Sequence, residues 1–256
     1  MNNKTLLALC LLAAVFTSCT RLYSPALFHN DIAYQPKPAS FDKEKMATYV
    51  SAGLDAHASP GYNDVLLSGQ LNLSQGFTTD KFNFSYGGFA SFGDYQAGEY
   101  ADTKAPDYFK NKFFGAVGGR VSMNTYVNND RVDVRIIGIE AAYSHEFGSY
   151  ADFRNSVKDL SGFYVDPRVN LITVGLTTEV IFHNRDNKDL QHGIRGFLGT
   201  TLGKNQLYDT HYQDDQSTVR MLRNIFPKAS YYFKYYKYFG TIEVGSAVFL
   251  RVGYQF

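Results

Sequence analysis

Two groups of residues combine histidine with the partners that nucleophilic catalysis requires. In the first group, His145 lies between Ser144 and Glu146. The second group sets one histidine among three acids: His211, Asp209, Asp214 and Asp215. A histidine that takes a proton from serine, and is oriented by a carboxylate, could support acyl transfer or hydrolysis. Neither group has the spacing of a known motif, so we interpret both as chance clusters and predict no catalytic residue.

Metal and cofactor chemistry has equally little support. His183 and His192 flank the acid-containing turn 184–189, which lacks the glycine and terminal glutamate of a calcium loop. Both cysteines, Cys10 and Cys19, lie near the amino terminus, so residues 20–256 offer no disulfide, thiol nucleophile or cysteine-ligated metal. We predict no metal site and no cofactor.

The charge balance argues against a nucleic-acid partner. The chain has 25 Lys and Arg against 24 Asp and Glu, and no long basic run. Neither a net field nor a local basic patch would therefore attract a polyanion.

The amino terminus is typical of an export signal. Lys4 precedes an apolar run over 6–16, which has the length of the hydrophobic region of a secretory signal peptide rather than of a membrane span. The string Phe16-Thr17-Ser18-Cys19 resembles the bacterial lipoprotein box, which implies that Cys19 is acylated and becomes the new terminus. The alternative is an ordinary signal peptide in which Cys19 is incidental. Residues 20–45 carry three prolines and no regular period, and we interpret 19–45 as a lipidated tether after a cleaved signal peptide, 1–18.

From Met46 onward the apolar pattern has a period of two, which predicts strands. Phe82, Phe84 and Tyr86, for example, alternate with Asn83 and Ser85. The predicted strands are about 46–57, 64–77, 81–93, 112–127, 131–147, 168–183, 193–204, 225–236, 238–244 and 247–256. The phase changes at Ile136-Ile137, which predicts a β-bulge.

Connection lengths alternate between short turns and long polar loops, as in a transmembrane β-barrel. The long loops are about 94–111, 148–167 and 205–224, and they would be extracellular. The tight connections at 59–61 and 245–246 would leave one side of that rim low. We predict an all-β, antiparallel barrel of ten strands over 46–256, with eight strands as the alternative. A soluble sandwich or lipocalin-like barrel also alternates. Aromatic residues near the strand ends and polar faces rich in Gly, Ser and Thr argue against the soluble alternatives, and the signal peptide and terminal Phe256 favour the membrane.

The last nine residues carry a resemblance to a family. They resemble the final strand of outer-membrane β-barrel proteins of Gram-negative bacteria, and the match implies that Val252, Tyr254 and Phe256 form the signal read by the barrel-assembly machinery. The lipoprotein box followed by a spacer is similar to small barrel lipoproteins of the Bacteroidota type. The resemblance implies an exported protein in the outer membrane, in contact with its lipid and anchored at its amino terminus.

If the apolar faces point to lipid, the opposite faces place charges of both signs in the lumen. Those that define the expected interior are Asp55, Arg120, Arg135, Glu140, Glu179, Arg195, Glu243 and Arg251. Charges confined in a narrow barrel must pair to offset desolvation, so we predict a filled, salt-bridged lumen. A narrow pore for small solutes is the alternative.

The loops suggest a role in contact rather than in chemistry. They carry seven tyrosines, at 95, 100, 108, 150, 164, 208 and 212, which suit contact with an envelope protein or a glycan. We expect a structural or accessory barrel that is not an enzyme. A narrow pore and a lipid-modifying enzyme are the alternatives, and the sequence does not identify the partner.

Overall fold

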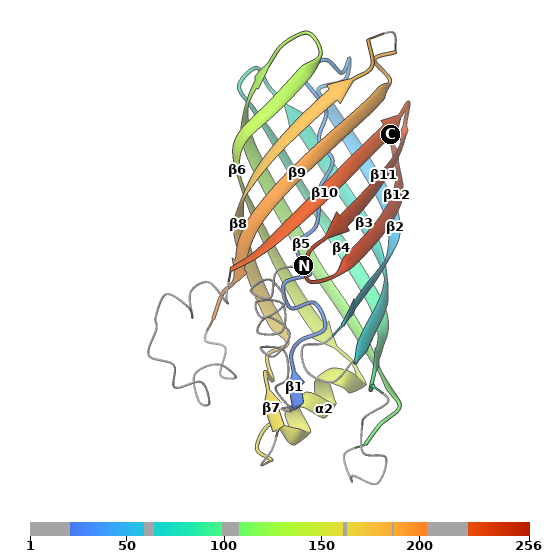
Figure 1. Ribbon diagram of the computed structural model, residues 1–256, viewed down its shortest axis with the longest axis vertical. Coiled ribbons are helices and arrows are strands. Elements are labelled where there is room, and N and C mark those ends of the chain that lie inside the picture. Colours follow the sequence, from blue (N-terminus) through green and yellow to red (C-terminus); the bar gives the residue numbers. More distant parts are fainter. Residues whose placement is uncertain (1–20, 59–63, 99–107, 161–162, 186, 204–224) are drawn as a thin grey trace, which may run out of the picture.

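The computed structural model describes residues 21–58, 64–98, 108–160, 163–185, 187–203 and 225–256. Within these ranges ten strands form a closed antiparallel barrel (Figure 1). The strands are β2 (Met46–Ala58), β3 (Val65–Thr78), β4 (Phe82–Gln96), β5 (Asn111–Asn128), β6 (Val132–Phe147), β8 (Asn170–His183), β9 (Leu190–Thr201), β10 (Ile225–Tyr235), β11 (Tyr238–Val244) and β12 (Val248–Gln255). Each bound lies within three residues of the predicted one.

Each strand pairs with its neighbour in the chain, and the last strand pairs with the first. β12 lies antiparallel to β2, from Val248 opposite Ala56 to Gln255 opposite Tyr49. This pairing closes the ring and leaves none of the ten strands with a free edge. The predicted fold class, an antiparallel β-barrel of ten strands, is confirmed, and the eight-stranded and sandwich alternatives are wrong.

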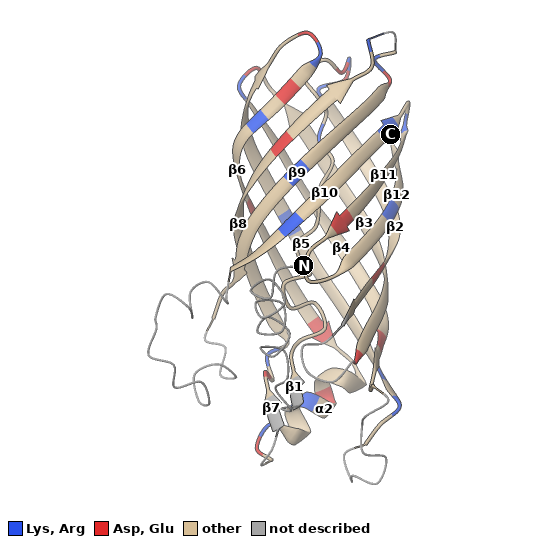
Figure 2. Ribbon diagram, viewed as in Figure 1, with Lys and Arg blue, Asp and Glu red and all other residues tan. Residues whose placement is uncertain are grey.

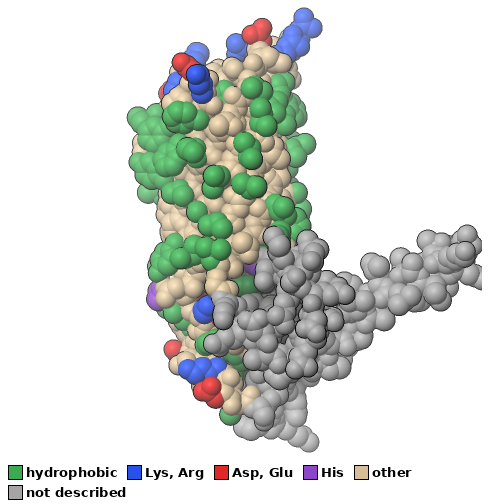
Figure 3. All heavy atoms as spheres, turned by 90° about the vertical axis from the view of Figure 1, so that its left-hand side faces the viewer, with side chains coloured by type: hydrophobic (Ala, Val, Ile, Leu, Met, Phe, Trp, Pro, Cys, Tyr) green, Lys and Arg blue, Asp and Glu red, His purple; other side chains and the backbone are tan. Residues whose placement is uncertain are grey.

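The barrel is apolar outside and polar inside. On the outer face Leu71 is 60%, Ile139 59% and Val252 66% exposed, whereas the adjacent Glu140 and Arg251 are each 3% exposed. Figure 3 shows apolar side chains spread over the wall and charged side chains gathered towards its ends. A lipocalin-like barrel would have the opposite orientation, so the alternation is that of a transmembrane barrel.

The phase change in β6 is a β-bulge. Arg135 and Gly138 pair with Glu179 and Thr177 on β8, so β6 has one residue more than its neighbour between these pairs. As a result Ile136 and Ile137 are both exposed on the outer face, and the lumen-facing residues on either side keep their orientation. This prediction is confirmed.

The two ends of the barrel differ. One end, which we call the short-turn end, carries the connections 79–81, 129–131, 184–189 and 236–237. The other, the long-loop end, carries α2 (Ser149–Val157), β7 (Phe163–Val165) and β1 (Arg21–Tyr23), none of which we predicted (Figure 1). β1 pairs with β7 in parallel outside the barrel. No helix in the described ranges is long and apolar enough to cross a membrane.

The prediction of a free tether over 19–45 is wrong for residues 24–42. Residues 24–42, which we call the plug segment, run inside the barrel from the long-loop end to the short-turn end, where β2 begins (Figure 1). Most of the segment is buried, including Asn30, Asp31, Ile32 and Tyr34. A free tether would be solvated, so this part of the chain belongs to the interior of the fold.

Candidate functional site

The lumen and the plug segment together form the most elaborate polar site in the described structure. Contacts between them follow β6 from one end to the other. The Ala26 N–H donates to Glu146 Oε2 at 2.7 Å near the long-loop end, and the Ser40 N–H donates to Asp133 Oδ2 at 2.6 Å near the short-turn end. The plug segment therefore crosses the whole barrel rather than capping one opening.

Tyr34, midway along the plug segment, binds two glutamates on the barrel wall. Its hydroxyl donates to Glu179 Oε1 at 2.6 Å, and its N–H donates to Glu243 Oε2 at 2.9 Å. Glu179 on β8 also pairs with Arg135 on β6, with 2.5 Å between Oε2 and Nη1. Arg135 Nη2 donates in turn to the Lys37 carbonyl at 3.2 Å. The same carboxylates therefore neutralise wall arginines and hold the plug segment.

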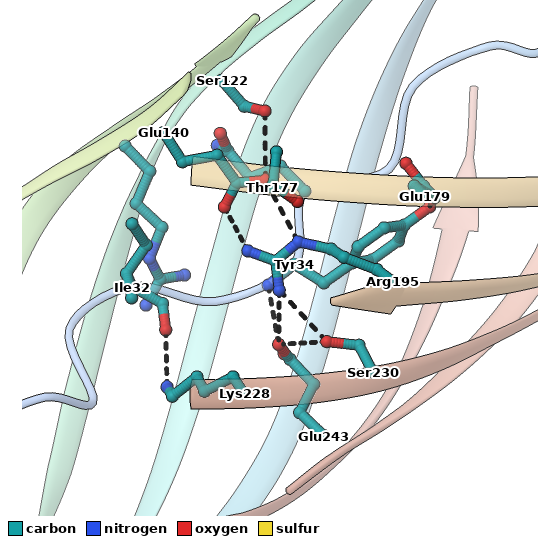
Figure 4. Close-up of polar contacts among 12 residues, drawn as sticks. Ile32, Tyr34, Ser122, Glu140, Thr177, Glu179, Arg195, Lys228, Ser230 and Glu243 are labelled. Carbon is teal, nitrogen blue, oxygen red and sulfur yellow. Dashed lines mark hydrogen bonds and ion pairs between the residues drawn. The ribbon is translucent and has the colours of Figure 1, made fainter. Parts of the chain in front are cut away.

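A second network surrounds Arg195 on β9 (Figure 4). Arg195 forms an ion pair with Glu140 on β6, and its Nη1 donates to Ser230 Oγ at 3.1 Å. The same nitrogen lies 3.7 Å from Glu243 Oε2, and Glu243 forms a further ion pair with Arg251 on β12. All four charged side chains are buried, so each charge has the partner that removal from water requires.

Two wall cations bind backbone carbonyls of the plug segment. Arg120 Nε donates to the Asp31 carbonyl at 2.6 Å, and Lys228 Nζ donates to the Ile32 carbonyl at 2.8 Å. The plug segment is not part of the barrel's strand ladder, so its buried carbonyls need such partners. Figure 2 shows how basic and acidic positions are interspersed along the wall that supplies them.

Further polar contacts hold the plug segment at the short-turn end. Gln191 Nε2 donates to Asp42 Oδ1 at 2.5 Å, and Lys234 Nζ lies 3.4 Å from Asp42 Oδ2. Thr78 Oγ1 donates to the Pro38 carbonyl at 2.5 Å. These contacts fix the plug segment just before the chain enters β2.

At the long-loop end, α2 covers the point where the plug segment enters the lumen. Tyr150 OH donates to the Ser24 carbonyl at 2.9 Å, and Arg154 Nη2 pairs with Glu146 Oε1 at 2.7 Å. Burial raises the pKa of the Tyr150 hydroxyl well above its usual value, against the opposing effect of Arg154. The phenol is therefore a stable hydrogen-bond donor at this position.

Aromatic rings surround this entry point. Tyr150 stacks on Tyr95 with 4.2 Å between ring centroids, and Tyr23 of β1 meets Phe153 edge to face at 5.2 Å. Phe109 packs on Phe153 at 4.7 Å. Together these rings form a hydrophobic cap between α2, β1 and the ends of β4 and β5.

The eight residues expected to define the lumen all lie on the inner wall and are buried. Seven of them belong to the networks above or bind the plug segment: Arg120, Arg135, Glu140, Glu179, Arg195, Glu243 and Arg251. The eighth, Asp55, accepts a hydrogen bond from Ser68 Oγ at 2.5 Å. The sequence missed what most of them contact, because the tether was not expected to enter the barrel.

The carboxy-terminal residues occupy the last strand and its end. The side chains of Val252 and Phe256 are exposed, and Tyr254 is half-buried beside Phe256, with 4.9 Å between ring centroids. The Phe256 N–H donates to the Thr48 carbonyl on β2 at 2.9 Å, at the short-turn end. Cys19 lies outside the described residues.

The candidate catalytic groups are not assembled where the structure describes them. Ser144 points into the lumen, 3.4 Å from Asp31 Oδ2, whereas His145 is exposed on the outer face, 2.9 Å from Asn170 Oδ1. Glu146 is held by Arg154. His211 and its three acids lie outside the described residues, and no group of three metal-binding side chains occurs among those that are described.

The loop tyrosines that the structure describes are not all exposed. Tyr95 and Tyr150 are fully buried in the cap, which contradicts their expected exposure, whereas Tyr108 is exposed. Tyr100, Tyr208 and Tyr212, and the side chain of Tyr164, lie outside what the structure describes. Tyr95 lies within β4, two residues beyond the predicted end of that strand, and it continues the inward-facing side of Ser85 and Ser91. The predicted strand is too short, so Tyr95 falls in the predicted loop.

Comparison with known proteins identifies no family. No family model matches the chain, and no curated protein does. Among solved structures, neisserial surface protein A is similar at 13% identity and a TM-score of 0.35, covering 82% of this chain and 96% of its own. An outer membrane channel from Pseudomonas putida F1 is similar at 11% identity and a TM-score of 0.38, covering 87% and 100%. Scores this low carry no argument, so the fold assignment depends on the strand pairing itself.

Proposed function

We propose that the chain is an outer-membrane barrel lipoprotein whose lumen is closed by its own amino-terminal segment. It has a structural or accessory role, in which the long-loop end contacts another envelope component, a protein or a glycan. The observation that carries this proposal is the plug segment, which is bound to charged wall residues along the whole barrel.

The apolar wall and the amino-terminal sequence support the membrane location. A closed barrel that exposes residues such as Leu71, Ile139 and Val252 requires lipid around it. The signal sequence and the lipoprotein box support export and acylation at Cys19. The proposed partners during assembly are outer-membrane lipid and the barrel-assembly machinery, which would read Val252, Tyr254 and Phe256.

The plug segment inside the lumen supports an accessory role over transport. A barrel of about ten strands leaves space for side chains and little else, and here an extra length of chain also occupies that space. Opening a path would separate Tyr34 from Glu179 and Glu243, and would leave buried carboxylates without these donors.

Conductance in planar bilayers tests the closed lumen. We expect the purified protein to show no steady openings, and a variant lacking the plug segment, residues 24–42, to conduct. A Tyr34→Ala, Lys37→Ala double variant keeps the wall intact and should conduct intermittently. A gel shift between unheated and boiled samples would establish that each variant is folded. Steady openings of the unaltered protein would contradict the proposal and favour the narrow pore.

The absence of enzymatic activity is also part of the proposal. We expect the lipid A and the phospholipids of a deletion strain to have the same masses as those of the parent strain. A missing acyl chain or head group, restored by the gene, would favour the lipid-modifying enzyme instead.

A further inference from the structure

The two ends of the described chain lie at opposite ends of the barrel. Phe256 binds Thr48 at the short-turn end, where β2 begins. β1, by contrast, lies beyond the long-loop end, with Arg21 opposite Phe163 of β7 (Figure 1). The plug segment connects β1 to β2 through the lumen, so the chain crosses the membrane once more than its ten strands require.

The position of β1 is fixed by several contacts outside the barrel. The Asp166 N–H donates to the Tyr23 carbonyl at 2.9 Å, and the Tyr23 ring packs on Phe153 of α2. Immediately after β1, Ser24 is held by Tyr150. These contacts are independent of those in the lumen. Both sets of contacts show that the chain enters the barrel at the long-loop end and leaves it at the short-turn end.

The barrel is too tall for the preceding residues to reach its other end. The plug contacts span β6 from Glu146 to Asp133, which is about 34 Å along the axis at about 3.4 Å per residue and a tilt of about 40°. Cys19 precedes Arg21 by two residues, and two residues of extended chain cover at most about 7 Å.

We infer that the mature amino terminus, with the lipid that Cys19 is proposed to carry, lies on the long-loop face of the membrane. In outer-membrane barrels the short turns face the periplasm and the long loops face outward. The acyl chains would then enter the outer leaflet, on the cell surface, while the carboxy terminus faces the periplasm. This inference rests on the proposed membrane location and acylation, and it adds the side on which the anchor lies.

Labelling with a membrane-impermeant maleimide tests the inference. Three cysteine variants report on three places: Arg21→Cys at the start of β1, Asn155→Cys on the exposed face of α2, and Asp130→Cys in a short turn. On intact cells we expect Arg21→Cys and Asn155→Cys to be labelled, and Asp130→Cys to be labelled only after lysis. A short epitope inserted between Thr20 and Arg21 tests the same place without depending on access to one thiol, and it should bind antibody on intact cells.

Two other labelling results would contradict the inference, one through the threading of the chain and one through the orientation of the barrel. If Asn155→Cys is labelled on intact cells, but the residue 21 thiol and the epitope react only after lysis, the threading is wrong. If all long-loop sites react only after lysis and Asp130→Cys reacts before it, the barrel has the reverse orientation and the surface anchor is wrong.

The lipid has its own readout, which separates failure of acylation from failure of the topology. Cells fed an alkyne-bearing fatty acid should label the unaltered protein and not a Cys19→Ala variant. Maleimide labelling of the unaltered protein would show that Cys19 is a free thiol, which would overturn the anchor.

Discussion

At the scale of single residues, Glu243 connects the wall to the plug segment. It pairs with Arg251, lies near Arg195 and accepts the Tyr34 N–H, all in a buried setting. Removing one member of such a group leaves the others charged and without a partner in a region of low dielectric constant.

We therefore expect Glu243→Gln to lower the free energy of unfolding by about 3–5 kcal/mol, because two buried arginines lose their shared carboxylate. The measurement is the midpoint of the gel mobility shift against temperature and urea in detergent. Glu44→Gln, on an exposed side chain at the short-turn end, is the control and should leave the midpoint unchanged. Equal midpoints for the two variants would show that the network is not needed for stability.

The Tyr34 hydroxyl makes a smaller contribution. Tyr34→Phe removes one hydrogen bond to a charged acceptor, Glu179, and should cost about 1.5–3 kcal/mol. Tyr238→Phe, on the outer face, is the matched control. If the two variants unfold alike, Tyr34 does not hold the plug segment through its side chain.

The sequence predicted which charges face the lumen but not what they bind. Alternation along a strand places Arg120 and Lys228 on the inner face, because side chains at every second position share one face. In the lumen Arg120 binds the Asp31 carbonyl, and Lys228 binds the Ile32 carbonyl. Every residue has a carbonyl, so no residue type in 24–42 marks these contacts.

At the scale of elements, the strands were predictable because the period of two is uninterrupted over most of them. Even the bulge in β6 was visible, since Ile136 and Ile137 are adjacent apolar residues in an alternating run. α2, β1 and β7 were missed, because short elements in polar loops carry no sustained period. Their position depends on tertiary contacts with the plug segment, such as Tyr150 with Ser24.

Strand β9 contains a glycine that the packing requires. Phe197 lies in the lumen against Gly199, where an added Cβ would be 2.3 Å from ring atom Cζ. In the same strand an added Cβ at Gly196 would meet only Thr178 Cγ2, at 3.6 Å.

We expect Gly199→Ala to displace the Phe197 ring and to lower stability by about 1–3 kcal/mol, as overpacking usually does. Gly196→Ala should be nearly neutral. Urea titration of the two variants, followed by tyrosine fluorescence and gel mobility, compares them. An equal loss in both would mean that the strand backbone, rather than the ring, determines the cost.

At the scale of the whole molecule, the last residue should matter for assembly more than for stability. Phe256 is exposed and makes one backbone hydrogen bond to Thr48. Deleting it should therefore reduce the amount of barrel in the outer membrane several-fold, while the fraction that assembles keeps its gel shift. Phe256→Tyr retains an aromatic ring and serves as the control. Normal yields from the deletion would show that Val252 and Tyr254 suffice as the signal.

The pairing of β12 with β2 also constrains the order in which the barrel assembles. The seam joins β12 to β2, so the ring stays open at least until β12 has been made. The plug segment is made before any of these strands, and it ends up encircled by all of them. We therefore expect the ten strands to close around a segment that is already present, so that the plug segment acts as the template for the interior of the barrel.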